Sequence, residues 1–255
     1  MNDQDKPVER LRAIMDRLLA PGGCPWDREQ THESLLRYLI EESYEVVEAV
    51  KKGDVEKFRE ELGDLLLQVV FHCALAEREG WFTFDDVAGT VGDKMIQRHP
   101  HVFGSLELKT SGEVLDHWEG FKKKEGQKYL LSGIPPMMPA LLRALKIQEK
   151  AARIGFDWPG VDGAIDKWTE ELAELKQART AEEIKEEIGD LFFALVNISR
   201  MKGVEPEDAL QDCNDKFTRR FNYMEDAARK RGQNLSALTL EALDQLWDEA
   251  KAKGL

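Results

Sequence analysis

One set of acidic residues in the second half of the sequence has the spacing of a metal-binding or acid–base site. Its members are Glu171, Glu174, Glu187 and Asp190. Within each pair the residues are three positions apart, so on a helix both side chains project from the same face. Glu174 lies six residues before Thr180, and Glu187 lies seven after it. If the chain reverses at Thr180, we expect the four carboxylates to gather in one small region.

A matching set in the first half consists of Glu42, Glu45, Glu61 and Asp64. Glu45 lies eight residues before Gly53 and Glu61 eight residues after it, so a reversal at Gly53 and Asp54 would bring this set level as well. A lone pair of glutamates on a helix is most often solvated. Two pairs level across a turn, present twice in one chain, indicate a site instead.

Carboxylates held this close together repel, by about 1 kcal/mol for each close pair even in a water-like dielectric. The second set also has apolar neighbours, Leu191, Phe192 and Phe193, which add a cost of desolvation. Either raised pKa values or a bound divalent cation would relieve this repulsion. Because the sets offer only oxygen atoms, without His or Cys, they favour Mg²⁺, with Mn²⁺ as a substitute, over Zn²⁺.

The elements that must position these residues are helices. Apolar residues recur at helical spacing along most of the chain, for example over 11–19, 35–50 and 62–71. Alternating β-branched runs bounded by hairpin dipeptides are nearly absent. Thr180 and Glu183 have the spacing of a capping box that opens the helix carrying Glu187. The sequence therefore predicts an all-α fold.

Four motifs of the first half recur in the same order in the second half, which predicts two tandem copies of one helical module. They pair 41–45 with 170–174, 60–65 with 186–191, 93–98 with 215–220, and Trp118 and Lys122 with Trp247 and Lys251. Between the copies, the prolines of 131–139 cannot continue a helix. We therefore expect modules at 1–127 and 141–255, joined by a proline-rich linker at 128–140.

Composition narrows the class of protein. The chain has 255 residues, with 36 basic and 49 acidic side chains and a net charge of −13, which argues against nucleic acid or an anionic membrane as a partner. It contains no apolar run long enough to span a bilayer, and its N-terminus does not read as a secretory signal. Its three widely spaced cysteines fit a reducing compartment. We expect a cytoplasmic protein.

The ordered motifs resemble those of the MazG family of nucleoside triphosphate pyrophosphohydrolases in its two-domain form. The resemblance covers nearly the whole chain and is carried by both acidic sets and by three further motifs: GCPWD at 23–27, RHPHVF at 98–103 and GFDW at 155–158. It implies an all-α NTP pyrophosphatase fold that dimerises to complete a four-helix core around Mg²⁺. The implied reaction converts ribo- and deoxyribonucleoside triphosphates to nucleoside monophosphates and pyrophosphate.

The resemblance also implies roles for single residues, mainly in the second module. Its acidic set would hold the metal, and Glu170 would orient water or act as a base, unless it points to solvent. Lys216 and Arg220 share a helix face and would hold phosphate oxygens, unless they pair with neighbouring acids. Trp247 and Lys251 would serve the nucleotide, although a tryptophan at helical spacing is more often core. A lesser second site would comprise Glu42, Glu45, Glu61, Asp64, Lys94, Arg98, Trp118 and Lys122.

Two rival functions stay open. A base-selective dNTP or phosphoribosyl-ATP pyrophosphohydrolase shares the helical pattern of acids. A non-catalytic acidic adaptor would use the same helix faces to bind partner proteins. The chain has no Walker A motif or GxGxxG loop, so a glycine loop that cradles phosphates is not the expected route.

Overall fold

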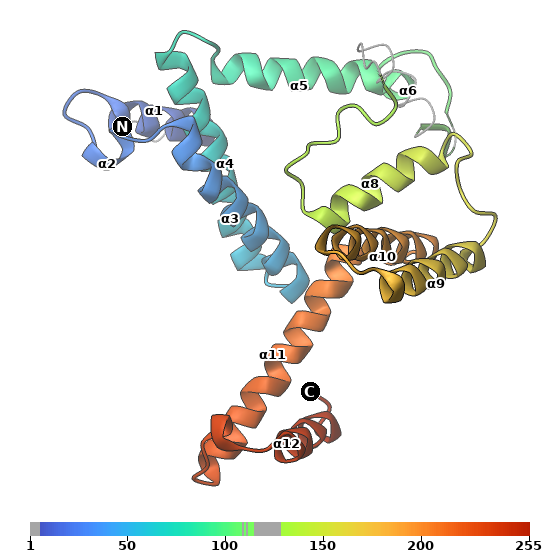
Figure 1. Cartoon of the computed structure of the whole chain (residues 1–255). Coiled ribbons are helices and arrows are strands. Elements are labelled where there is room, and N and C mark those ends of the chain that lie inside the picture. Colours follow the sequence, from blue (N-terminus) through green and yellow to red (C-terminus); the bar gives the residue numbers. More distant parts are fainter. Residues whose placement is uncertain (1–5, 109, 111, 115–128) are drawn as a thin grey trace. The chain divides into compact units, whose positions relative to one another are not determined.

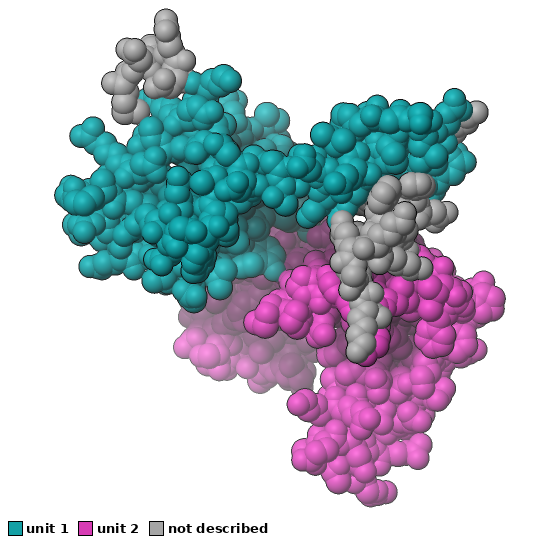
Figure 2. Space-filling model, turned by 90° about the horizontal axis from the view of Figure 1, so that it is seen from above, with its two compact units in different colours: residues 1–121 teal, residues 122–255 magenta. Residues whose placement is uncertain are grey.

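The computed structural model describes residues 6–108, 110, 112–114 and 129–255, and every regular element in these residues is a helix. The all-α prediction is confirmed. The chain divides into two compact units, Met1–Phe121 and Lys122–Leu255 (Figure 2). The predicted division into modules at 1–127 and 141–255, with a linker at 128–140, stays a prediction. No helix among the described residues is both long and apolar enough to cross a membrane.

The first unit is built on a pair of long helices, α3 and α4. Its described helices are α1 (Pro7–Leu19), α2 (Pro25–Arg28), α3 (His32–Lys52), α4 (Val55–Arg78), α5 (Phe84–Arg98) and α6 (Pro100–Phe103). Helices α3 and α4 lie side by side as a hairpin, and α1 packs against α4 (Figure 1). An apolar cluster that includes Met15, Leu35 and Phe71 holds α1, α3 and α4 together.

The turn between α3 and α4 follows from two residues. Gly53 adopts a left-handed conformation with φ 67°, which a residue without a Cβ reaches at little cost. Asp54 then caps α4, since its carboxylate accepts the Lys57 backbone N–H at 3.0 Å. The chain therefore reverses where the spacing of the first acidic set required it.

The second unit also contains a helix hairpin and adds three further described helices and a 3₁₀ turn. Its described elements are α8 (Ala140–Ala152), α9 (Val161–Gln177), α10 (Ala181–Met201), α11 (Pro206–Lys230), the 3₁₀ turn η1 (Leu235–Ala237) and α12 (Leu240–Ala252). Helices α9 and α10 form a hairpin, α8 packs on α10, and α12 packs on α11 (Figure 1). Met224, Ala228 and Leu246 form the core between α11 and α12.

The turn between α9 and α10 contains the predicted capping box. Thr180 accepts the Glu183 backbone N–H at 3.1 Å, and the Glu183 carboxylate accepts the Thr180 N–H at 3.0 Å. These bonds satisfy two of the donors that the first turn of a helix leaves unpaired. They also stop α9 from running on, so that α10 returns beside it.

Candidate active site

The α9–α10 hairpin brings three carboxylates together. Oxygen atoms of Glu171, Glu187 and Asp190 all lie within 4.8 Å of one another. Glu171 is only 5% exposed, whereas Asp190 lies on the surface. Glu174, the fourth predicted member, is exposed and lies outside this triple, but it is close enough for its negative charge to raise the pKa of Glu187. Three of the four acids therefore converge on one point, and the fourth lies beside them.

Glu187 shows that this cluster is electrostatically incomplete. Its Oε2 atom is buried and accepts no hydrogen bond. Burial raises the pKa of Glu187, and the negative charges of Glu174 and Glu171 raise it further. A buried acceptor without a donor is costly, and a cation among oxygen ligands would satisfy it. The donor set therefore fits a divalent cation.

A lysine that the sequence analysis did not single out neutralises part of this charge. Lys167 Nζ lies 2.5 Å from Glu171 Oε1 and 3.0 Å from Glu170 Oε1. The hydrogen bond from Lys167 lowers the pKa of Glu171, and the same contact raises the pKa of Lys167 above its ordinary value. The four-residue spacing of Lys167 and Glu171 on one helix could have predicted this ion pair. Glu170 itself is largely exposed.

The first unit gathers a different triple. Here the converging oxygens belong to Glu42, Glu45 and Glu61. Glu61 is 1% exposed and forms an ion pair with Lys57 of its own helix. Burial raises the pKa of Glu42, helped by the charge of Asp64, and the charge of Glu61 raises the pKa of Glu45. In this unit the ion pair of Lys57 and Glu61 lies on α4, the second helix of the hairpin. In the other unit the ion pair of Lys167 and Glu171 lies on α9, the first helix of its hairpin.

The predicted phosphate and base residues of the second module lie on α11 and α12. Arg220 sits over the Trp247 ring, 5.3 Å from its centroid, and its Nε donates to the Leu255 carbonyl at 2.7 Å. Lys216 is exposed, and Lys251 pairs with Asp248 at 3.1 Å. In the described second unit, no hydrogen bond or ion pair joins these four residues to the carboxylates. The structure thus brings Arg220 and Trp247 together but shows no contact between them and the acids.

The first-module counterparts are only partly described. Lys94 and Arg98 lie four residues apart on α5. Trp118 and Lys122 lie outside the described residues.

Comparison with known proteins identifies the family. A model described as the MazG nucleotide pyrophosphohydrolase domain matches residues 30–103 and 166–224, more than half of the chain. The chain belongs to the MazG family. The two matched segments contain the first and the second acidic set. The family and the enzyme class expected from the sequence are therefore confirmed.

Curated relatives cover almost the entire chain. It is 47% identical over 95% of both chains to the nucleoside triphosphate pyrophosphohydrolase/pyrophosphatase MazG of Thermotoga maritima. It is 43% identical to the nucleoside triphosphate pyrophosphohydrolase of Escherichia coli, over 96% of this chain and 97% of that protein. A solved MazG-related protein from Thermotoga maritima is 34% identical, with a TM-score of 0.40, over 45% of this chain and 98% of its own.

Proposed function

We propose that this MazG protein hydrolyses ribo- and deoxyribonucleoside triphosphates to nucleoside monophosphates and pyrophosphate, with Mg²⁺ as cofactor and broad tolerance of the base. The observation that carries this proposal is the convergence of Glu171, Glu187 and Asp190 around a buried, unpaired oxygen of Glu187. The names of the full-length relatives support the reaction.

The roles of the side chains follow from their charge and position. Glu171, Glu187 and Asp190 hold the cation, and Glu174 joins them from the next turn of α9. When bound, Mg²⁺ neutralises triphosphate charge and lowers the pKa of a bound water. Glu170 orients the attacking water or accepts its proton.

Basic side chains complete the proposed site by binding the triphosphate. Lys167 forms an ion pair with Glu171. Once a bound cation neutralises the Glu171 carboxylate, Lys167 becomes available to bind phosphate oxygens. Lys216 and Arg220 bind phosphate oxygens from α11, and Trp247 and Lys251 of α12 complete the nucleotide site. The first module, with Glu42, Glu45, Glu61 and Asp64, is the lesser site.

We propose a homodimer as the working form. Helix α10 exposes an apolar stripe made of Ile184, Ile188, Phe192 and Leu195, each between 39% and 54% exposed. A Cβ added to Gly189 would meet no atom within 4 Å, so no contact within one chain requires a glycine at this position. Large exposed apolar stripes favour association. A second copy of the hairpin would cover the stripe and complete a four-helix core.

A product analysis tests the reaction. Purified protein is incubated with each common ribo- and deoxyribonucleoside triphosphate and Mg²⁺, and the products are separated. We expect monophosphate and pyrophosphate from every base, and none when the metal is chelated. Diphosphate and phosphate would overturn cleavage at the α-phosphorus. Turnover of a single base would favour the base-selective rival, and no turnover the adaptor.

A further inference from the structure

The connection between α8 and α9 carries a tryptophan with one supported face. Trp158 is 46% exposed. A Cβ added to Gly163, in the first turn of α9, would lie 2.9, 3.0 and 3.3 Å from its Cε3, Cδ2 and Cγ atoms. Such similar distances to three adjacent ring atoms mean that the glycine faces the plane of the indole. Gly163 therefore lets the ring lie against the helix, while much of its remaining surface is open to solvent.

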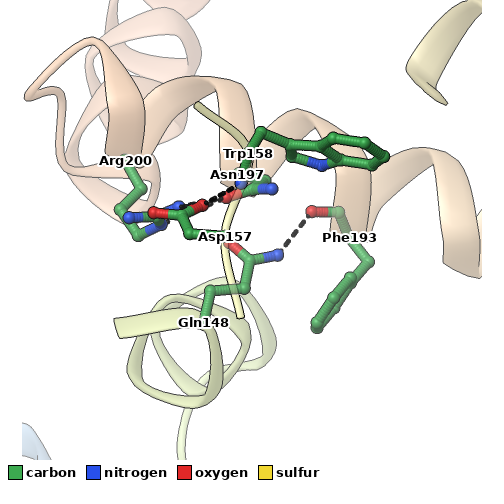
Figure 3. A network of polar contacts seen from close by, with 6 residues as sticks. All are labelled: Gln148, Asp157, Trp158, Phe193, Asn197 and Arg200. Atoms are coloured by element: carbon green, nitrogen blue, oxygen red, sulfur yellow. Dashed lines mark hydrogen bonds and ion pairs between the residues drawn. The ribbon is translucent and has the colours of Figure 1, made fainter. Parts of the chain in front are cut away.

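Polar contacts anchor the segment that carries this tryptophan to α10. Asp157 accepts the Trp158 backbone N–H at 2.9 Å and forms an ion pair of 2.5 Å with Arg200 (Figure 3). Arg200 also donates to Asn197 Oδ1 from Nε and Nη2, at 3.1 and 2.8 Å. Asp157 and Arg200 are 43 residues apart, so the contact is tertiary. The backbone that carries the indole is thereby tied to α10.

A second contact braces the same region. Buried Gln148 of α8 donates from Nε2 to the Phe193 carbonyl of α10 at 2.7 Å (Figure 3). Helix α8 and helix α10 are thus joined directly beneath the connection that carries Trp158.

The segment that carries Trp158 lies along the hairpin from the carboxylates. Asn197, which binds Arg200, follows Asp190 by seven residues and so lies on the same face of α10, about 10 Å along its axis. Gly163 precedes Glu171 by eight residues, or about 12 Å along α9. Both helices therefore place the segment that carries Trp158 about 10 to 12 Å from the acids along the axis of the hairpin.

We infer that Trp158 is the surface on which the nucleobase of the substrate stacks, an inference that rests on the proposed function. Stacking tolerates any base because every base has a π-face. Among the polar atoms near the indole, Asp157 Oδ1 and Asn197 Oδ1 already accept hydrogen bonds from Arg200. Trp247 is a poorer platform because Phe217 and Arg220 both pack against its ring.

The test separates base stacking from a merely structural role. Trp158→Leu, Trp158→Phe and the control Trp26→Leu are compared with the wild type on ATP, UTP and methyl triphosphate, which has no base. Trp26 is the matched control because it precedes the first acidic set and is 51% exposed. We expect Trp158→Leu to raise KM for ATP about tenfold at unchanged kcat. KM for methyl triphosphate should not change, Trp158→Phe should retain most of the affinity, and Trp26→Leu should resemble the wild type.

Several outcomes would overturn the inference. They are an unchanged KM for ATP in Trp158→Leu, an equal loss with methyl triphosphate, an equal effect of Trp26→Leu, and a change in oligomeric mass, which would mean that a second copy covers the indole. If the wild type hydrolyses no triphosphate, the proposed function fails by itself. Calorimetric binding of α,β-methylene-ATP then decides, since an unchanged Kd in Trp158→Leu overturns the platform and a Kd about tenfold weaker supports it.

Discussion

The buried Oε2 of Glu187 leads to a prediction about charge. Glu187→Gln removes one negative charge from a cluster in which burial and neighbouring acids already raise the pKa of this carboxyl. We expect the variant to melt at a higher temperature than the wild type when divalent cations are absent. Mutating a residue that hydrogen-bonds to a metal ligand typically lowers activity about 10- to 100-fold. Since Glu187 is itself a proposed ligand, the rate of pyrophosphate release should fall at least this much.

Differential scanning calorimetry in chelator and a pyrophosphate assay in Mg²⁺ measure both effects. Glu186→Gln is the matched control, because it makes the same change at the neighbouring exposed position outside the cluster. A Glu187→Gln protein that is both less stable and fully active would contradict the metal site.

A histidine pair in the first unit predicts a pH dependence of stability. His32 Nδ1 and His72 Nδ1 are 2.8 Å apart, and the Trp81 ring stacks on His32 with centroids 5.3 Å apart. Only one of these two nitrogens carries a hydrogen, because two N–H groups cannot face each other at this distance. Burial lowers the pKa of His72, and the charge of His32 lowers it further.

The sign follows from linkage. Below the ordinary histidine pKa of about 6.5, the unfolded chain binds a proton that His72 in the folded unit resists, so folding stability falls as the pH drops. We expect the melting temperature of the wild type to decrease from pH 7.5 to pH 5.5, and to decrease less in His72→Phe. His101→Phe changes a histidine outside the pair and should keep the wild-type slope. Equal slopes for all three proteins would refute the role of the pair.

At the scale of elements, the turn between α9 and α10 determines whether the acids come level. Thr180→Ala removes the side-chain acceptor of the capping box and should destabilise the protein by about 1 kcal/mol. A shift of the urea midpoint at unchanged slope measures this loss.

Thr169→Ala is the control within the same hairpin. Thr169 lies in the middle of α9, where its hydroxyl bonds back to the Ile165 carbonyl at 2.9 Å. Alanine is a better helix former there, so this variant should be neutral or stabilising. If the two variants lose equal stability, the cap is not what sets the turn.

At the scale of the whole molecule, the apolar stripe of α10 predicts self-association. Phe192 is 54% exposed and lies in the middle of that stripe. Phe192→Glu should shift the sedimentation mass from dimer toward monomer, because a second copy would have to bury the new charge. The control Gln177→Glu adds the same charge at the exposed end of α9 and should leave the mass unchanged. A wild type that sediments as a monomer would contradict the proposed homodimer.

The sequence by itself determined the helices, their turns and the family. Those features depend on local rules: the apolar period, the glycine and aspartate at 53 and 54, and the Thr180–Glu183 cap all act within a few residues. The same rules placed the acidic pairs level across each turn. The ordered motifs were specific enough to predict the MazG family, which the comparisons then confirmed.

Only the tertiary structure decided which side chains meet. It brought the oxygens of Glu171, Glu187 and Asp190 within 4.8 Å of one another, buried one oxygen of Glu187, and joined Asp157 to Arg200 across 43 residues. Residue spacing states which face of its own helix a side chain occupies. It does not state how far one helix is rotated against the next, because packing between distant residues sets that rotation.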